Sequence, residues 1–196
     1  MTLFGLTLQI TALRFSKAKA REAHNYMERA VDYLRDLVKE LNIDCDYEHP
    51  GFLRVATSER YKKRILHEMK LAHQLGLEGI EWLDKEQIQT QVQSPMYLGA
   101  WWEPRCGILN PAKLAWGWAD VIKPMGVEIY ENTAVAEIVR ENGKVSLDTS
   151  HGRIRADKVV MATNAWSHFF KELKRKQIPV WTHIVMTEPL KQAHFD

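Results

Sequence analysis

The residue types that could carry chemistry in this chain are few, and their spacing favours neither metal-dependent nor nucleophilic catalysis. The eight histidines show no paired spacing of the kind that metal sites use. His67 and Glu68 lack the second histidine of a zinc-binding H-E-x-x-H helix. Cys106 follows Arg105, whose charge favours a thiolate, yet no base lies beside it in the sequence, and a lone cysteine in a turn is usually inert. What remains is a short run suited to binding.

That run is "KVVMATNAWS", residues 158–167, in which a strand-like segment leads into small and polar residues and then Trp166. Val-Val-Met is typical of a buried strand. Alanine, threonine and asparagine leave the backbone after it open, so that another group can approach closely. The pattern predicts a turn against which a ligand packs.

Composition describes an ordinary globular protein. The 196 residues are 45% hydrophobic and 27% charged, and the formal net charge is +2. This balance gives no basic surface for nucleic acid. No apolar run approaches the roughly 20 residues of a membrane span, and the opening residues lack the basic start of a signal peptide. We therefore expect a cytoplasmic protein in which Cys45 and Cys106 are free thiols.

In the first half of the chain, the pattern predicts helices between short strands. An irregular apolar opening precedes Ser16, which is placed to cap a long helix with one apolar stripe. Pro50-Gly51 marks a turn between two β segments. The predicted elements are a helix at 17–41, strands at 45–49 and 51–57, a helix from Ser58 to Leu75, a strand at 80–84, a helix at 84–91 and a strand at 97–107.

The second half predicts one helix followed by a β-meander. Asn110 before Pro111 is a helix start, since proline is favoured in the first helical position. A strand at 127–135 comes next, and then three segments divided by Asn142-Gly143 and His151-Gly152, which are tight-turn sequences. A long closing strand covers 178–190. The fold class is α+β, with an antiparallel or mixed sheet, packed helices and a β-meander.

Three segments carry a family resemblance, namely "GILNPAKLAWGWADVIKPMGVEIYENTAVAEI", "GKVSLDTSHGRIRADKVVMATNAWS" and "IPVWTHIVMTEPL". In this order they resemble the D-amino acid oxidase-like family of FAD-dependent oxidoreductases, and within it the glycine, sarcosine and γ-glutamylputrescine oxidase group. The resemblance implies that residues 1–109 form a substrate-domain-like region. Residues 110–167 would then resemble part of the FAD domain, and residues 168–196 would return to the substrate-domain sheet.

The resemblance also implies which residues touch FAD, although it assigns no catalytic residue. Val135 corresponds to a valine whose backbone lies against the adenine side of the cofactor. Ala162, Thr163 and Asn164 correspond to the turn that lies against the cofactor, with Trp166 beside it. The family usually has glycine where this chain has Asn164. Asparagine tolerates left-handed backbone angles better than most residues, so the turn is expected to survive with a narrower approach.

The implied activity is the oxidation of an amine or amino acid by FAD, but one motif is missing. The sequence contains no Gly-x-Gly, whereas such enzymes hold the pyrophosphate of FAD with Gly-x-Gly-x-x-Gly at a helix start. We therefore expect a truncated FAD-dependent oxidoreductase that neither retains FAD nor turns over by itself. The alternative is a non-catalytic module, derived from a flavoprotein substrate domain, that binds a small molecule or a partner.

Self-association is a further expectation. Without the rest of a two-domain flavoprotein, strand edges and apolar surface would be exposed, and both favour pairing with another chain. The segments that favour it are Val180–Thr187 and the apolar opening Leu3–Leu13. The sequence thus predicts a homo-oligomer, most simply a two-fold dimer.

Overall fold

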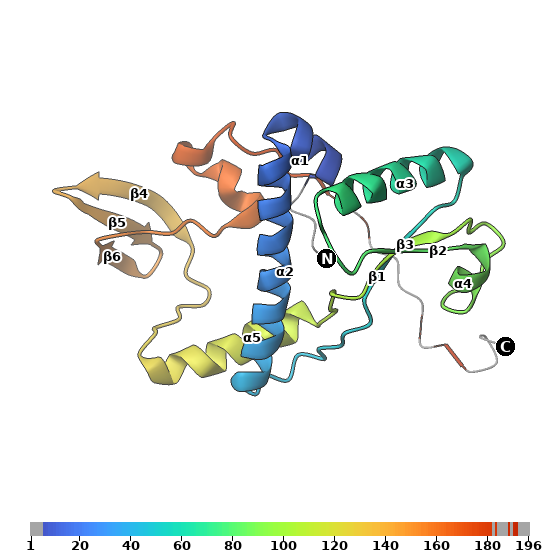
Figure 1. Cartoon of the computed structure of the whole chain (residues 1–196). Helices are drawn as coiled ribbons and strands as arrows, with labels where there is room; N and C mark the ends of the chain where they lie inside the picture. Colours follow the sequence, from blue (N-terminus) through green and yellow to red (C-terminus); the bar gives the residue numbers. More distant parts are fainter. Residues whose placement is uncertain (1–5, 182, 184–187, 189, 192–196) are drawn as a thin grey trace. The chain divides into compact units, whose positions relative to one another are not determined.

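Two compact units make up the chain, residues 1–129 and residues 130–196. The structure is a computed structural model that describes residues 6–181, 183, 188, 190 and 191. Each unit has its own three-stranded antiparallel sheet (Figure 1). This confirms the predicted α+β class.

Polar side chains start the helices of the first unit. Ser16 and Ser58 each accept a hydrogen bond from the backbone N–H three residues later, and Asp84 forms a capping box with Gln87. Because the first N–H groups of a helix have no partner within it, these caps fix the helix starts that the sequence predicts. The helical elements are α1 (Leu8–Arg14), α2 (Lys17–Glu40), α3 (Glu59–Gln74), α4 (Lys85–Gln89), α5 (Pro111–Ile122) and the 3₁₀ turn η1 (Lys123–Met125).

Helix α1 corrects the prediction of an irregular opening. The side chain of Thr7 accepts a hydrogen bond from the N–H of Ile10, and the N–H of Leu8 donates to the carboxylate of Glu68 at 3.1 Å. Leu8 and Thr11 are buried. The contact with Glu68 joins residues 60 positions apart, so no local pattern could predict it.

The sheet of this unit has the order β1-β3-β2, with β3 (Ala100–Glu103) between β1 (Phe52–Val55) and β2 (Glu81–Leu83). The predicted strand at 45–49 is wrong. Its only ladder contact among the described residues is a single bridge between Glu48 and Ile108, and one bridge does not make a strand.

Two apolar clusters hold the first unit together. One includes Ile65 and Trp101, which are buried between α3 and the sheet. The other surrounds Val38 near the end of α2, where Leu114 and Trp118 of α5 pack against it. Helices α2 and α5 therefore share one core, and α3 covers another.

A buried ion pair lies against the first cluster. The guanidinium Nη2 of Arg54 donates to Oε2 of Glu68 at 2.9 Å, and the two side chains are 16% and 3% exposed. The same guanidinium lies over the ring of Trp101, 4.6 Å from its centroid. One carboxylate thus connects β1, α3 and the first turn of α1, since it also accepts the N–H of Leu8.

The second unit contains the predicted meander, with strands β4 (Val135–Glu141), β5 (Lys144–Thr149) and β6 (Gly152–Ala156) in that order. The predicted turn at Asn142-Gly143 is confirmed, and the second turn lies one residue earlier than predicted, at Ser150-His151, because Gly152 already pairs with Thr149 as the first residue of β6. Asn142 and Gly143 have φ angles of 50° and 75°, which is the left-handed pair that a two-residue hairpin turn needs. The guanidinium of Arg153 binds Asp148 across β5 and β6 and holds the pKa of that carboxyl below its usual range.

Two predicted strands are absent, however. Residues 127–134 and 158–163 form no ladder with any described residue, and strand propensity without a partner does not make a strand. Val160 is 89% exposed, so the expected buried strand end is an exposed segment here. The 3₁₀ turns η2 (Asn164–Phe169) and η3 (Lys171–Leu173) follow it.

The closing strand at 178–190 and the opening segment bear on the expected dimer. Much of 178–190, including 182 and 184–187, lies outside the described residues, as do residues 1–5. Within the described part, Val180 and Trp181 are exposed, and Leu13 is exposed while Leu8 is buried. The dimer stays a prediction. No helix among the described residues has the length and apolar character needed to span a membrane.

We predict that Arg54→Met lowers the free energy of unfolding of the first unit by about 3 kcal/mol, because it leaves the buried charge of Glu68 unpaired. The double variant Arg54→Met/Glu68→Gln should recover most of this loss, since glutamine is uncharged and still accepts the N–H of Leu8. Urea unfolding followed by tryptophan fluorescence measures both. Arg64→Met, at an exposed position of α3, is the matched control. A loss no larger than that of the control would refute the role of the pair.

We also predict that Gly143→Ala destabilises the hairpin of β4 and β5 by about 1 kcal/mol. A Cβ at this position meets no atom within 4 Å, so the cost comes from the left-handed backbone alone. Gly143→Asn should cost less, because asparagine tolerates these angles. Amide hydrogen exchange of the two strands gives the comparison, and equal effects of alanine and asparagine would count against this account.

Candidate functional site

Val135 begins the first strand of the second unit. It pairs with Thr149, and the register shifts between Val135 and Glu137, which is the mark of a β-bulge. Its side chain is half-buried. The ladder is thus irregular at this end of β4, where the resemblance implies a backbone contact with the cofactor.

The turn at Ala162–Asn164 has the open backbone that its small residues predict. Ala162 and Asn164 are exposed, and Asn164 has a φ angle of 44°. The expectation that asparagine accepts a left-handed conformation here is confirmed. The hydroxyl of Thr163 lies 2.8 Å from that of buried Ser167, which ties the turn to the helical segment after it.

Trp166 stands beside this turn with an exposed ring. Its backbone N–H donates to the carbonyl of Thr163 at 3.0 Å, while 61% of the residue is exposed. His168 forms a 2.6 Å hydrogen bond between Nδ1 and the carbonyl of Ala165. Backbone bonds thus hold the segment, and the indole remains free to stack on a flat group.

A hollow of about 370 Å³, the turn pocket, lies on one side of the turn. Asn164 lines it, whereas Val135, Ala162, Thr163 and Trp166 do not. Its lining residues are Asn164, Ala165, Gln177, Ile178, Pro179, Val180 and Trp181. The volume is at the lower end for small-molecule sites, so the pocket is small for a whole dinucleotide.

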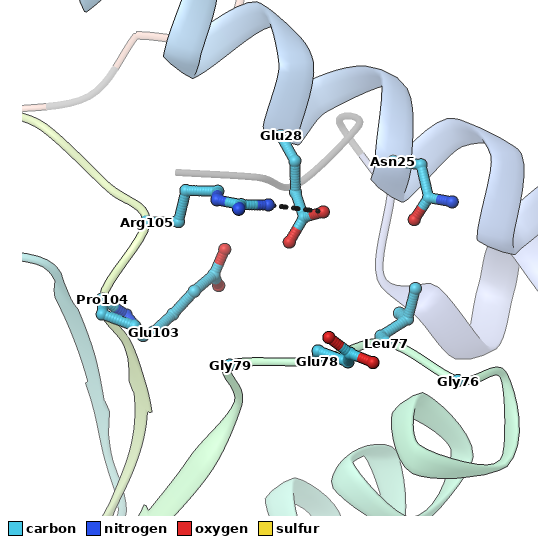
Figure 2. A pocket seen from close by; sticks show the side chains of 9 residues that line it. All are labelled: Asn25, Glu28, Gly76, Leu77, Glu78, Gly79, Glu103, Pro104 and Arg105. Carbon is cyan, nitrogen blue, oxygen red and sulfur yellow. Dashed lines mark ion pairs between the residues drawn. The ribbon is translucent and has the colours of Figure 1, made fainter.

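A second hollow, the charged pocket, lies in the first unit and has a volume of about 430 Å³ (Figure 2). Its residues come from α2, from the loop between α3 and β2, and from the end of β3 with the residues after it. It is lined by Asn25, Glu28, Gly76, Leu77, Glu78, Gly79, Glu103, Pro104 and Arg105. The lining includes three carboxylates and one guanidinium.

The charges of this pocket are partly paired. Arg105 lies 3.2 Å from Oε2 of Glu28 and 3.8 Å from Asp32, and the first of these ion pairs is the dashed line of Figure 2. Glu103 is buried and accepts a long hydrogen bond from the indole N–H of Trp101 at 3.4 Å. Glu78 is exposed at the opposite wall.

Sequence reasoning missed the charged pocket. Its carboxylates lie in segments about 25 to 50 residues apart, and no local motif connects them. The structure also bears on the cysteine and metal-ligand candidates of the sequence. Cys106 is buried, so its thiol is not accessible. In the part of the chain that the structure describes, no three His, Cys, Asp or Glu residues gather as metal ligands.

Comparison with known proteins adds the family. A probable oxidoreductase OrdL of Haemophilus influenzae is 28% identical over 91% of this chain and 42% of its own length. Gamma-glutamylputrescine oxidoreductase of Escherichia coli is 31% identical over 88% of this chain and 41% of its own length. The chain thus spans about two fifths of the length of these curated relatives.

Solved structures of other enzymes share the fold of this chain. Glycine oxidase from Geobacillus kaustophilus superposes with a TM-score of 0.67 at 25% identity, over 72% of this chain and 40% of the enzyme. L-proline dehydrogenase from P. horikoshii shares the fold, with a TM-score of 0.68 at 22% identity, over 89% of this chain and 46% of the other. The family model of FAD dependent oxidoreductases matches residues 7–196. The chain therefore belongs to the FAD dependent oxidoreductase family.

Proposed function

We propose that this chain is part of an FAD-dependent oxidoreductase that acts on an amine or amino acid. The observation that carries the proposal is the family match over residues 7–196. The named compounds of its relatives, glycine and γ-glutamylputrescine, both bear an amino group. Since the chain spans about two fifths of the length of its curated relatives, the activity of a whole enzyme is a proposal for it.

We assign to the second unit a contact surface for FAD. The small side chains at 162 and 165 and the left-handed Asn164 leave the backbone of the turn accessible to a flat ring. Trp166 offers an exposed aromatic face beside the turn, and the bulge after Val135 offers backbone groups. FAD would supply the hydride-accepting chemistry when it is bound, and the residues of this chain would position the cofactor.

In this proposal the part of the first unit before residue 110 serves the substrate. Residues 1–109 form the substrate-domain-like region, residues 110–167 contribute to the FAD side, and residues 168–196 return to the substrate side. The first of these regions holds the buried carboxylate of Glu103 beside a hollow, with the half-buried Glu28 on the same lining. The division stands on the family resemblance.

We further propose that the 196-residue chain does not hold FAD tightly by itself. Its sequence has no Gly-x-Gly-x-x-Gly, and the turn pocket is smaller than a dinucleotide requires. Contact through one turn and one strand end gives only weak binding, because most of the cofactor surface remains exposed to solvent. The proposal expects a colourless protein without turnover on simple amines, and a binding surface that saturates only at high FAD concentration.

We predict that FAD shifts the amide resonances of residues 162–166 in an NMR titration of the chain, and that Asn164→Gly tightens this weak binding about fivefold, or ~1 kcal/mol. Removing the side chain of residue 164 lets the cofactor approach the turn more closely. Asn132→Gly is the matched control, because Asn132 also has a left-handed φ angle, of 52°, yet does not line the turn pocket.

Three outcomes would overturn parts of this proposal. A yellow protein with stoichiometric flavin, or peroxide formation above the blank, would refute the claim that the chain alone is inactive. Shifts confined to the first unit would refute the assigned contact surface. An equal gain from Asn164→Gly and Asn132→Gly would show that backbone freedom, rather than access to the turn, controls the binding.

A further inference from the structure

We propose that the groove between helices α1 and α2 of the first unit binds a small apolar carboxylate, such as a medium-chain fatty acid. The groove has a volume of about 570 Å³, and all of its lining residues lie within residues 1–129. The inference goes beyond the proposed oxidoreductase function, because it uses neither FAD nor the turn at 162–166. It rests on the apolar walls of the groove and on the one cation in its lining that has no ion pair.

The short connection between the two helices creates the groove. Helix α1 ends at Arg14 and α2 begins at Lys17, so that two residues join them. A connection of this length keeps the helices in contact, and α1 lies against α2 (Figure 1). Leu8 of α1 and Ala20 of α2 are buried in the same apolar cluster. Because residues of both helices line the groove, this shared contact holds its two walls together.

The walls of the groove are mostly apolar. Phe15, at the end of α1, and Tyr26, on α2, both line it, and these residues are 67% and 58% exposed. Ala23 lies three residues before Tyr26 on the same face of α2, where its small side chain leaves space between larger neighbours. A ligand that covers these rings removes apolar surface from water, which favours binding. The walls therefore suit a ligand with an apolar body.

The one carboxylate of the lining is already paired. Oε2 of Glu22 lies 2.6 Å from Nζ of Lys19, and both side chains are exposed. The hydrogen bond and the charge of Lys19 hold the pKa of the Glu22 carboxyl below its usual value, so both groups are charged at neutral pH. Each therefore offsets the charge of the other.

Arg29 is the second cation of the lining. Its guanidinium lies over the ring of Tyr26, 5.9 Å from the ring centroid, and it forms no ion pair with any residue that the structure describes. Its influence on the pKa of Glu22 is the smallest of those that act on that carboxyl. Because a guanidinium binds a carboxylate through two parallel hydrogen bonds, Arg29 offers the groove a site for one carboxylate group.

Size and charge together favour a small monoanion over other ligands. Two cations and one carboxylate in the lining leave a single positive charge for a ligand to meet. An ammonium ligand would be repelled by Arg29, and a polyanion would leave the aromatic walls uncovered. The volume lies within the range of about 300–1,000 Å³ that small-molecule sites have. A fatty acid of medium length combines one carboxylate with an apolar body of suitable size.

The test is isothermal titration calorimetry of the whole chain without FAD, with sodium octanoate below its micelle concentration as the probe. The comparison ligands are 1-octanol, octylamine and sodium butyrate at matched ionic strength. We expect octanoate to bind about tenfold more tightly than 1-octanol, because only the carboxylate meets Arg29. Butyrate should bind at least about tenfold more weakly than octanoate, since its short chain covers less of the walls. The amide resonances of Ala23 and Tyr26 should shift with octanoate.

Two substitutions separate the charged contact from the apolar one. Arg29→Gln should weaken octanoate binding about tenfold and leave 1-octanol binding unchanged. Ala23→Leu should weaken both ligands about tenfold, because the larger side chain fills the groove. Arg21→Gln and Ala18→Leu are the matched controls, since both positions are exposed on α2 and lie outside the lining. Neither control should change the affinity by more than about twofold, and far-UV circular dichroism checks that each variant is folded.

Several results would overturn the proposal. Octanoate binding that is absent, or equal to that of 1-octanol, would show that the groove does not recognise a carboxylate. Tighter binding of octylamine would make Glu22 the charged contact instead. Equal losses in Arg29→Gln and Arg21→Gln would show that binding follows the overall charge of α2. A dimer in light scattering that Ala23→Leu dissociates, without octanoate binding, would show that a second copy of the chain fills the groove. Because no FAD is present, these outcomes are separate from those of the proposed oxidoreductase function.

Discussion

The first unit depends on one buried carboxylate. Glu68 is almost completely enclosed, and its two oxygens bind the guanidinium of Arg54 and the N–H of Leu8. Burying a carboxylate costs free energy unless the carboxylate is paired and hydrogen-bonded. Its stability in the fold therefore requires β1, α3 and the start of α1 to pack together around it. The amide of Leu8 also lies at a helix N-terminus, where negative charge is favoured.

The charged pocket is connected to this pair through one aromatic ring. The Arg54 guanidinium lies over Trp101, and the indole N–H of the same residue donates to Glu103. Trp101 sits on the central strand of the sheet and is buried. Trp101 therefore contacts both the buried ion pair and a carboxylate of the pocket wall.

The sequence could predict the features that rest on neighbouring residues, and it failed where distant ones decide. The helix caps at Ser16 and Ser58 and the turn at Asn142 could be predicted, because each depends only on residues close by in the sequence. The charged pocket and the helix α1 depend on contacts between segments that are far apart. The segments at 127–134 and 158–163 have the composition of strands, but a strand exists only with a partner, and composition does not name one. At the turn, the residue types predicted that Asn164 would accept a left-handed backbone. The pocket beside it is lined by residues of two separate segments and could be found only from the three-dimensional structure.

The two candidate sites differ in what makes them suitable for ligands. In the turn the useful property is exposed backbone. Its small side chains leave the backbone uncovered, and local hydrogen bonds hold it in place. In the charged pocket the useful property is charge that the fold encloses at Glu103 on β3 and partly encloses at Glu28 on α2. Preorganised charge retains its effect without a second molecule to complete it, because its desolvation is met during folding. An open turn gains affinity only from the surface that covers it. The two hollows therefore differ in kind, since one presents charged side chains and the other lies beside uncovered backbone.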